Sequence, residues 1–488
     1  MLQIKDAFLL KTKSYINGRW VKSLSTFAVS NPLDQSVIAE IANVGAVETK
    51  QAIEAAHTAF ESWKRLSAKQ RGCYLKQWAA LIYQHWDDIS TILTYEAGKP
   101  FEESTHELMG CVGFLNWHAS EAERLYGYAP QSPDPNRRFL VLRQPVGVVG
   151  VISPWNFPSV LIIQKCAPAL AAGCTVVLKP AEDTPLSALV HAELAHRAGI
   201  PPGVFNVLTC RDPQIVGREM TSHPLVRKLT FTGSTQVGKI LAAASSHTVK
   251  NLCMELGGNC PAIIFEDADL NKAVPSTFWF KFYNSGQCCN NINRIFVQEK
   301  IYDTYVEQFQ NMLNKHLKLG FGMDKTVNIG PLINEQGVAK VEALVDDALA
   351  KGALALCGGR RGAMGSFFYE PTLLINVNQE MHMYREEVFG PVASCYRFTS
   401  EEEVITMAND TSHGLAAYLY TENMSRSWRV AEALEAGSVG VNTHDVCSEL
   451  LPFGGWKQSG LGRENGAIGS LNDYCETKSL VIAGISKL

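Results

Sequence analysis

Two short stretches of this sequence combine residue types that can carry out nucleophilic chemistry. Cys289 ends the segment Gly286-Gln287-Cys288-Cys289, a glycine-containing turn, and Glu255 lies 34 residues upstream (289 minus 255) beside a double glycine. A thiol on a turn can attack an electrophilic carbon, and a partly desolvated carboxylate of raised pKa can take a proton from water. Taken singly, each has a more ordinary interpretation, because most cysteines are buried small hydrophobes and a Glu beside Gly-Gly is commonly a turn residue.

A side-chain amide precedes these two residues in the chain. Asn156 lies in the loop Ser153-Pro154-Trp155-Asn156-Phe157-Pro158, where prolines restrict the backbone on both sides of the Trp-Asn-Phe triplet. A rigidly held amide can donate a hydrogen bond to a developing oxyanion. An Asn in a proline-rich turn is otherwise ordinary turn chemistry.

Short apolar strands alternate with helical patterns around these loops. A first series of expected strands and helices covers 146–153, 160–172, 175–178, 187–198, 204–208 and 228–231. A second series covers 262–265, a helix from Leu270, 292–297, 301–317, 336–351, 367–375 and 392–398. This alternation is typical of a parallel, doubly wound α/β sheet, whose ligands bind at the carboxyl ends of the strands.

The remaining patterns predict a scaffold and an arm. Amphipathic periodicity predicts helices over 47–71, 75–96 and 106–125. The segment Tyr128–Pro135 carries three prolines within six residues, which predicts a linker or the start of a protruding arm. Strands are expected at 138–143 and 477–482, and the second of these could pair with a partner subunit.

Two of the expected strands end in polar segments suited to a dinucleotide. Lys179-Pro180-Ala181-Glu182 follows one strand, and Thr232-Gly233-Ser234 opens a helix that contains Gly238. A Lys and a Glu at a strand end can hold the two hydroxyls of a ribose, and the carboxylate repels a 2'-phosphate, which favours NAD over NADP. The helix N-terminus suits a pyrophosphate. A simple ion pair between Lys179 and Glu182 is the alternative.

Composition limits the classes of protein that fit. The length of 488 residues indicates two or three domains, and 46% hydrophobic with 19% charged residues is typical of a soluble globular protein. A formal net charge of -4 without a basic patch argues against nucleic-acid and membrane partners. No apolar run reaches the ~18 to 20 residues of a membrane helix, and the N-terminus lacks the pattern of a signal peptide, so we expect a cytoplasmic protein. The 13 irregularly spaced cysteines indicate reduced thiols, and no Cys or His group has zinc-ligand spacing.

Both candidate motifs resemble those of aldehyde dehydrogenases at the usual separation. Gly286-Gln287-Cys288-Cys289 is similar to that family's nucleophile loop, and Glu255-Leu256-Gly257-Gly258 is similar to its general-base motif. The resemblance extends from Tyr15-Ile16-Asn17-Gly18 to Gly460-Leu461-Gly462-Arg463-Glu464 and so covers nearly the whole chain. It implies an aldehyde dehydrogenase-like fold with a Rossmann-type NAD-binding domain, an α/β catalytic domain and a small oligomerisation flap.

The resemblance also implies a division of the chain and an oligomer. Residues 1–127 and 145–257 would form the NAD-binding domain and 258–440 the catalytic domain. Residues 128–144 and 475–488 would form the oligomerisation arm of a homodimer or homotetramer. Residues 441–474 would return to the NAD-binding domain.

The implied chemistry is oxidation of an aldehyde to its acid. Cys289 attacks the aldehyde, while the Asn156 amide and the Cys289 backbone N–H hold the oxyanion. Hydride passes to NAD and leaves a thioester, which water activated by Glu255 hydrolyses. Cys288 could form a regulatory disulfide with its neighbour or simply pack. A catalytically silent binding or structural protein on the same fold is the alternative of a different class.

Further residues match the family's cofactor positions. The Glu387 position binds the nicotinamide ribose, and the Phe389 position packs near that ring. The full set implied by the resemblance is Trp155, Lys179, Pro180, Ala181, Glu182, Gly233, Ser234, Gly238, Leu256, Glu387 and Phe389.

The general pattern is nearest to succinate-semialdehyde dehydrogenases, through the motifs at 179–185, 225–234 and 458–464. Those enzymes carry two arginines that hold the distal carboxylate, and the matching positions here are Tyr283 and Gln164. Neither residue supplies the cationic fork that carboxylate recognition uses. The expected pocket is neutral, which predicts an aromatic, hydroxylated or medium aliphatic aldehyde; succinate semialdehyde stays as the alternative because Ser448 and Lys165 could receive a carboxylate. The pocket residues expected are Phe157, Gln164, Trp279, Tyr283, Cys288, His444, Ser448 and Phe453.

Overall fold

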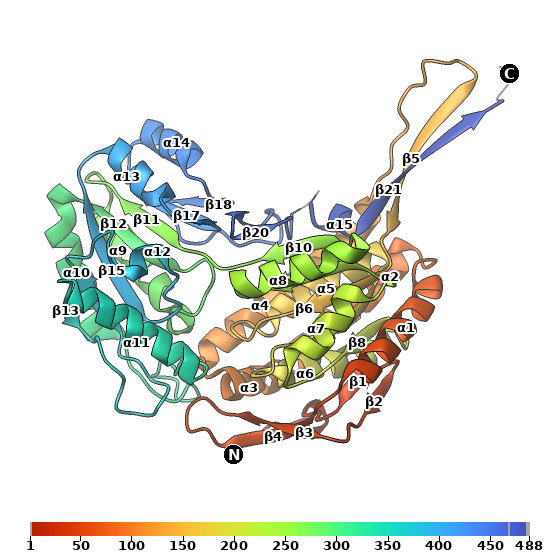
Figure 1. Cartoon of the computed structure of the whole chain (residues 1–488), viewed down its shortest axis with the longest axis horizontal. Helices are drawn as coiled ribbons and strands as arrows, with labels where there is room; N and C mark the ends of the chain where they lie inside the picture. Colours follow the sequence, from red (N-terminus) through yellow and green to blue (C-terminus); the bar gives the residue numbers. More distant parts are fainter. Residues whose placement is uncertain (1, 467–468, 485–488) are drawn as a thin grey trace.

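The computed structural model describes residues 2–466 and 469–484. Residues 1, 467–468 and 485–488 lie outside the described residues, and with them small parts of the expected N-terminal domain, the 441–474 segment and the arm. Two bodies, each built on a sheet, and a projecting two-stranded arm make up the described chain (Figure 1).

The first sheet has a parallel centre with antiparallel edges. Strands β8, β7, β6, β9 and β10 run parallel, whereas β1 and β20 pair antiparallel with their neighbours. The order is β2 (Arg19–Val21), β1 (Ser14–Ile16), β8 (Phe205–Val207), β7 (Thr175–Lys179), β6 (Val148–Ile152), β9 (Val226–Thr232), β10 (Asn251–Glu255) and β20 (Gly460–Leu461). Most residues of its central strands are buried, because helices cover both faces.

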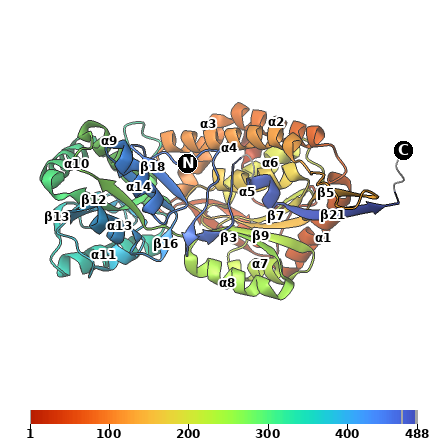
Figure 2. The same ribbon diagram turned by 90° about the horizontal axis from the view of Figure 1, so that it is seen from above.

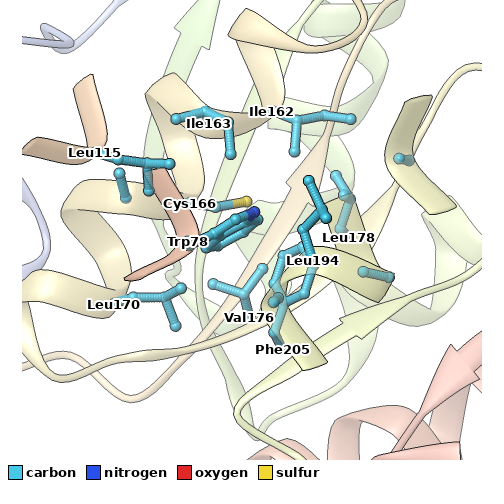
Figure 3. Close-up of a cluster of buried hydrophobic side chains, with 14 of the residues drawn as sticks. Trp78, Leu115, Ile162, Ile163, Cys166, Leu170, Val176, Leu178, Leu194 and Phe205 are labelled. Atoms are coloured by element: carbon cyan, nitrogen blue, oxygen red, sulfur yellow. The ribbon is translucent and has the colours of Figure 1, made fainter. Parts of the chain in front are cut away.

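Figure 2 shows how the helices divide between the two faces of this sheet. One face carries α2 (Ala68–Gln84), α3 (Trp86–Ala97), α4 (Phe101–Glu121), α5 (Val160–Ala172) and α6 (Pro185–Arg197). The other carries α1 (Ala46–Trp63), α7 (Pro213–Ser222) and α8 (Thr235–Ser245). Figure 3 shows the core of the first face, where Trp78 from α2 lies edge-on to Phe205 at a ring separation of 5.3 Å. This packing fixes α5, which follows the Asn156 loop.

The second sheet is parallel except at one edge, where β13 runs antiparallel. Its order is β13 (Leu354–Cys357), β14 (Thr372–Ile375), β15 (Val392–Phe398), β12 (Ile292–Gln298), β11 (Cys260–Ile264), β17 (Ala416–Tyr420) and β18 (Ser438–Val441). Alternate β11 residues enter different cores, since Ile263 packs in one cluster and Ala262 and Ile264 in another. The surrounding helices are α9 (Leu270–Phe282), α10 (Tyr302–His316), α11 (Glu335–Ala350), α13 (Glu401–Asn409) and α14 (Met424–Ala433). The predicted α/β class with parallel, helix-covered sheets is confirmed.

The arm consists of β5 (Arg137–Pro145) and β21 (Cys475–Ala483), which pair antiparallel from Cys475 opposite Pro145 to Ala483 opposite Arg137. It projects from the first body (Figure 1). The smaller elements are η1 (Ala7–Leu9), β3 (Thr26–Ser30), β4 (Val37–Ala42), η2 (Ala122–Arg124), η3 (Ser246–Thr248), η4 (Tyr283–Gly286), η5 (Glu299–Ile301), α12 (His382–Arg385), β16 (His413–Gly414), β19 (Trp456–Lys457) and α15 (Gly469–Asp473). Within the described residues, no helix combines the length and apolar character needed to cross a bilayer.

Several helix boundaries differ from those that periodicity predicts. The helix expected over 47–71 ends at Trp63, because Ser67 caps a new helix and exchanges hydrogen bonds with Gln70 in a capping box. The pattern over 75–96 covers parts of two helices that meet at His85. Helix α7, capped by Asp212, and strand β10 were not predicted. The strand expected over 367–375 is limited to its last four residues.

Candidate active site

The turn before Cys289 has an unusual backbone that its neighbours hold in place. Asn284 and Ser285 have φ of 48° and 55°, in the left-handed region that non-glycine residues rarely adopt. Glu103 accepts a hydrogen bond from the Asn284 backbone N–H at 2.9 Å, and the Ser285 hydroxyl donates to the Gly330 carbonyl at 2.9 Å. At Gly286 a Cβ would lie 2.1 Å from the Gly390 carbonyl oxygen, so only glycine fits. The turn therefore presents a half-buried Cys289 from a rigid support.

Glu255 meets the nucleophile loop where the chain passes from β10 in the first sheet to β11 in the second. A Cβ at Gly258 would lie 2.1 Å from the Cys289 carbonyl oxygen, so the two loops touch through their backbones. The Glu255 side chain is buried, and neither carboxylate oxygen has a hydrogen-bond partner among the described residues. Burial raises the pKa of Glu255 well above its usual range, and the nearby Glu464 carboxylate raises it further. A desolvated carboxyl beside a thiol is suited to accept a proton once it is ionised.

A buried ion pair, Lys165 with Glu464, lies close to Glu255. The Lys165 ammonium on α5 contacts the Glu464 carboxylate and donates to the Thr230 hydroxyl at 3.3 Å. Burial alone would lower the pKa of Lys165, but Glu464 together with Cys253 and Glu255 outweighs burial, so the pKa is raised. Glu464 is held by backbone hydrogen bonds in both directions with Phe453. Lys165 is thus already paired and is not a free cation for a substrate carboxylate.

Asn156 is tied directly to the nucleophile loop. Its side-chain Nδ2 donates to the Gln287 carbonyl, two residues before Cys289, at 3.1 Å. Its own carbonyl accepts from Lys99 Nζ at 2.8 Å and from Asn284 Nδ2 at 3.0 Å. An amide has two N–H groups, so one stays available to a substrate oxygen. The geometry suits an oxyanion donor.

The candidate cofactor residues lie in three places. Two are the carboxyl ends of β7 and β9, and the third is the loop between α12 and β15. Lys179 and Glu182 form an ion pair at 2.9 Å, and Ser234 caps α8, with its hydroxyl accepting from the Val237 N–H at 3.4 Å. Glycine at 238 lets Leu256 pack on α8, because a Cβ there would lie 2.3 Å from the Leu256 Cδ2.

The loop between α12 and β15 carries two further candidate residues, Glu387 and Phe389. Glu387 accepts from the Gly258 N–H at 3.1 Å, and burial raises its pKa to about 7. Phe389 lies edge-on to Trp155 with ring centroids 5.5 Å apart. An ion pair at one strand end, a helix N-terminus after the next strand and a carboxyl on the loop that carries Phe389 fit a nicotinamide dinucleotide.

The candidate substrate residues form an aromatic and polar group. Phe157 stacks on Tyr283 at 5.7 Å, and burial raises the pKa of the Tyr283 hydroxyl well above its usual range, so it stays neutral. Gln164 is buried in α5, and its side chain makes no hydrogen bond to another described residue. His444 stacks on Phe280 at 5.0 Å and bonds the Ser276 hydroxyl at 2.8 Å.

The rest of the expected pocket is only partly together. Phe453 is buried, and the Ser448 hydroxyl accepts from the Leu450 N–H at 3.2 Å. The Cys288 thiol donates to Asn290 Oδ1 at 2.8 Å, which favours a packing role. Trp279, expected in the same pocket, instead packs on Phe278 and His316 and is 43% exposed. Helical position alone could not show which side of α9 it would occupy.

Comparison with known proteins agrees with this geometry. Residues 20–480 match the model of the aldehyde dehydrogenase family. The chain belongs to the aldehyde dehydrogenase family. It is 48% identical to the 3-sulfolactaldehyde dehydrogenase of Pseudomonas putida, with all of both chains covered. It is 46% identical to the NADP-dependent succinate-semialdehyde dehydrogenase of Escherichia coli, covering 99% of this chain and 100% of that one.

Solved structures show the same fold. The succinate-semialdehyde dehydrogenase of Burkholderia pseudomallei superimposes with a TM-score of 0.97 at 47% identity, covering 99% of this chain and 100% of that one. The aldehyde dehydrogenase family, the enzyme class and the likeness to succinate-semialdehyde dehydrogenases that the sequence indicated are therefore confirmed.

Sequence reasoning missed several residues that support this aldehyde dehydrogenase site. Lys99, Glu103 and Glu107 contact the Asn156 loop or the nucleophile turn, and Glu464 lies beside Glu255. One signal was available, because Glu103 and Glu107 are four residues apart on α4 and so share a helix face near Lys99. Nothing local in the sequence identifies what that face contacts.

Proposed function

We propose that this aldehyde dehydrogenase oxidises an uncharged aldehyde, aromatic, hydroxylated or medium aliphatic, to its carboxylic acid with NAD. One observation carries the proposal. By the family resemblance, succinate-semialdehyde dehydrogenases have arginines at two positions where this chain has the neutral residues Tyr283 and Gln164. A half-buried, stacked Tyr283 and the buried amide of Gln164 offer hydrogen bonds but no positive charge. Desolvating a substrate carboxylate there without a cation is unfavourable.

The chemistry assigned to the chain's own residues has three steps. The Cys289 thiolate attacks the aldehyde carbon, and the free N–H of the Asn156 amide holds the oxygen that becomes negative. Lys179, Glu182, Glu387 and Phe389 would hold NAD, which would accept the hydride when bound. Glu255 then takes a proton from a water molecule, which releases the acid from its thioester with Cys289.

The choice of NAD rests on the Glu182 carboxylate. It lies at the end of β7, paired with Lys179, where the ribose hydroxyls of a dinucleotide bind in doubly wound sheets. A 2'-phosphate there would face the carboxylate. NADP is the alternative, because the Escherichia coli relative carries that cofactor in its name.

Succinate semialdehyde or another acid-bearing aldehyde is the competing substrate class. The names of the relatives support it, since succinate semialdehyde and 3-sulfolactaldehyde both end in an acid group. Against it stands the pairing of Lys165 with Glu464, which leaves Ser448 as the remaining candidate partner from the sequence.

The test is NADH formation with benzaldehyde, hexanal, succinate semialdehyde and 3-sulfolactaldehyde, using wild type and Cys289→Ala. We expect turnover with the first two, and none in the variant. A kcat/KM for either acid-bearing aldehyde well above that for the neutral ones would reject the neutral pocket. Rapid single-site alkylation of Cys289 by iodoacetamide without turnover of any aldehyde would favour a silent protein or another substrate.

We also propose the division of labour and assembly that the family resemblance implies. The body formed by 1–127 and 145–257 holds the cofactor, 258–440 supplies the nucleophile, and 441–474 returns to the first body. The arm at 128–144 and 475–488 joins subunits into a homodimer or homotetramer in the cytoplasm. Support comes from apolar side chains exposed on the arm strands, namely Leu140, Leu142, Val481 and Ile482. The molar mass by light scattering tests the assembly, and a monomer would contradict it.

A further inference from the structure

Lys99 is a fully buried lysine that contacts the loop carrying Asn156. Its Nζ lies 2.6 Å from Glu107 Oε2 and donates to the Asn156 carbonyl at 2.8 Å. The same ammonium lies 4.0 Å from the centre of the Phe157 ring. Lys99 lies in the turn between α3 and α4. Of its three partners, only Glu107 is close to it in sequence. Two of the three ammonium N–H groups are thus bonded, and the Phe157 ring lies beside the charge.

Glu107 completes the support at the other end of the same loop. Its second oxygen, Oε1, accepts the backbone N–H of Ser159 at 2.7 Å and that of Val160 at 3.0 Å. These N–H groups belong to the first turn of α5, which have no partner within the helix. The Lys99–Glu107 pair therefore fixes both the Asn156 carbonyl and the start of α5, and the loop between them cannot move independently.

The fixed carbonyl determines where the Asn156 side chain can point. Asn284 Nδ2 shares that carbonyl at 3.0 Å, and Asn156 Nδ2 donates to the Gln287 carbonyl at 3.1 Å. One N–H of the amide is thus spent on the nucleophile loop, and the direction of the other follows from the plane of the amide. A shift of the Asn156 backbone would move this N–H relative to Cys289. Oxyanion donors are effective only when they are aimed in advance.

We propose that Lys99 is a positioning residue that aims the Asn156 amide at the aldehyde oxygen. This inference rests on the proposed function in one respect, the role of Asn156 as oxyanion donor. Glu107 keeps the Lys99 ammonium in place, and Lys99 itself touches neither substrate nor cofactor. Its loss therefore affects the step in which negative charge develops on oxygen, and not the thiol or the cofactor site.

The main experiment is a double-mutant cycle between Lys99→Met and Asn156→Ala, with kcat measured on an aldehyde that wild type accepts. We expect Lys99→Met to lower kcat by about 10²-fold, comparable to loss of one oxyanion donor. The double variant should be no slower than Asn156→Ala alone, because both changes remove the same interaction. The KM for NAD and the rate of Cys289 alkylation by iodoacetamide should stay within about twofold of wild type, and Lys99→Arg should restore part of kcat.

A matched control separates this role from that of any buried ion pair. Lys228 is also fully buried, pairs with Asp473 at 2.6 Å and lies 4.9 Å from the Tyr474 ring, yet none of these partners belongs to the site. Lys228→Met should lose stability without a comparable loss of kcat. A kcat for Lys99→Met no lower than that of the control overturns the proposal, and so do losses that multiply in the double variant.

One further variant and two further outcomes make the result interpretable. If Lys99→Met does not fold, Glu107→Gln keeps both caps on α5 and weakens the hold on Lys99, and it should lower kcat a few-fold; an unchanged kcat overturns the inference. If Asn156→Ala retains wild-type kcat, the assignment of the oxyanion donor fails. If wild type oxidises none of the aldehydes, the proposed substrate class fails instead.

Discussion

Two carboxylates buried near the nucleophile loop differ completely in their surroundings. Both oxygens of Glu107 are bonded, one to the Lys99 ammonium and the other to two backbone N–H groups. Neither oxygen of Glu255 has a partner among the described residues, although it is buried to the same degree. One region of the site is thus fully satisfied, and the other is left unsatisfied.

The difference shows how the same residue type can support either geometry or reactivity. A buried charge with all its bonds made resists displacement, because losing one partner leaves the other charge unpaired. A buried carboxyl without bonds favours its neutral form and becomes a strong base when it does ionise. Unsatisfied buried groups are rare in folded proteins, so such a group beside a thiol indicates function.

The largest effect is expected for Glu255→Gln, which removes the base and keeps the shape. Steady-state turnover should fall by ~10² to 10⁴-fold, the usual contribution of a general base. The first burst of NADH should persist in stopped-flow absorbance, since Glu255 acts after hydride transfer. The free energy of unfolding in urea should be no lower than wild type, because no hydrogen bond is lost. Loss of the burst together with turnover would place Glu255 in an earlier step.

The opposite result is expected for Glu107→Ala. Removing this side chain leaves Lys99 buried without its counter-charge and takes two caps from α5. Breaking a buried pair in this way typically costs about 3–5 kcal/mol. The change should appear as a lower urea midpoint with an unchanged slope. Glu107→Gln retains the caps and should lose clearly less; equal losses in the two variants would mean that the ion pair contributes little.

The pH dependence of turnover should reveal the unsatisfied carboxyl. Burial, and then Glu464, hold the pKa of Glu255 well above its usual range, so turnover should rise with pH until the group ionises. Glu464→Gln removes a like charge and should move this rising limb to lower pH. A folded-state pKa raised above the unfolded value also means that Glu255 favours folding most at low pH, a contribution lost as pH rises through the folded pKa. A limb that does not move would show that Glu464 is too well screened by Lys165.

The sequence predicted the reactive residues around Glu255 better than the hydrogen-bonded residues around Glu107. Cys289, Glu255 and Asn156 stand in short motifs with glycine or proline beside them, and the structure brings their loops into contact. The bond from Lys99 to Asn156 spans 57 residues and that from Lys165 to Glu464 spans 299. Such pairs depend on how α4, α5 and the C-terminal segment pack, and no local pattern encodes that.

Element boundaries show the same limit on a smaller scale. Parallel strands such as β15 were predictable because apolar runs bounded by turns are needed where helices cover both faces. The end of α1 at Trp63 depends on which polar residues exchange cap hydrogen bonds, and Ser67 with Gln70 decided it. The exposure of Trp279 depends on the partners of α9, and its residue type alone does not encode them.

The smallest effect on stability is expected at another carboxylate, Glu182. It pairs with Lys179, but unlike Glu107 and Glu255 it is partly exposed to solvent. Lys179 is buried, but the Glu182 side chain is 32% exposed and Gln keeps an oxygen that can accept from Lys179, so Glu182→Gln should change the free energy of unfolding by only ~0–1 kcal/mol. Its effect should appear in cofactor choice, because the carboxylate that repels a 2'-phosphate is gone. The ratio of kcat/KM for NADP to that for NAD should rise about tenfold, equivalent to ~1.4 kcal/mol. Glu182→Asp keeps the charge and should preserve the NAD preference, whereas an unchanged ratio in Glu182→Gln would mean that this carboxylate does not face the ribose.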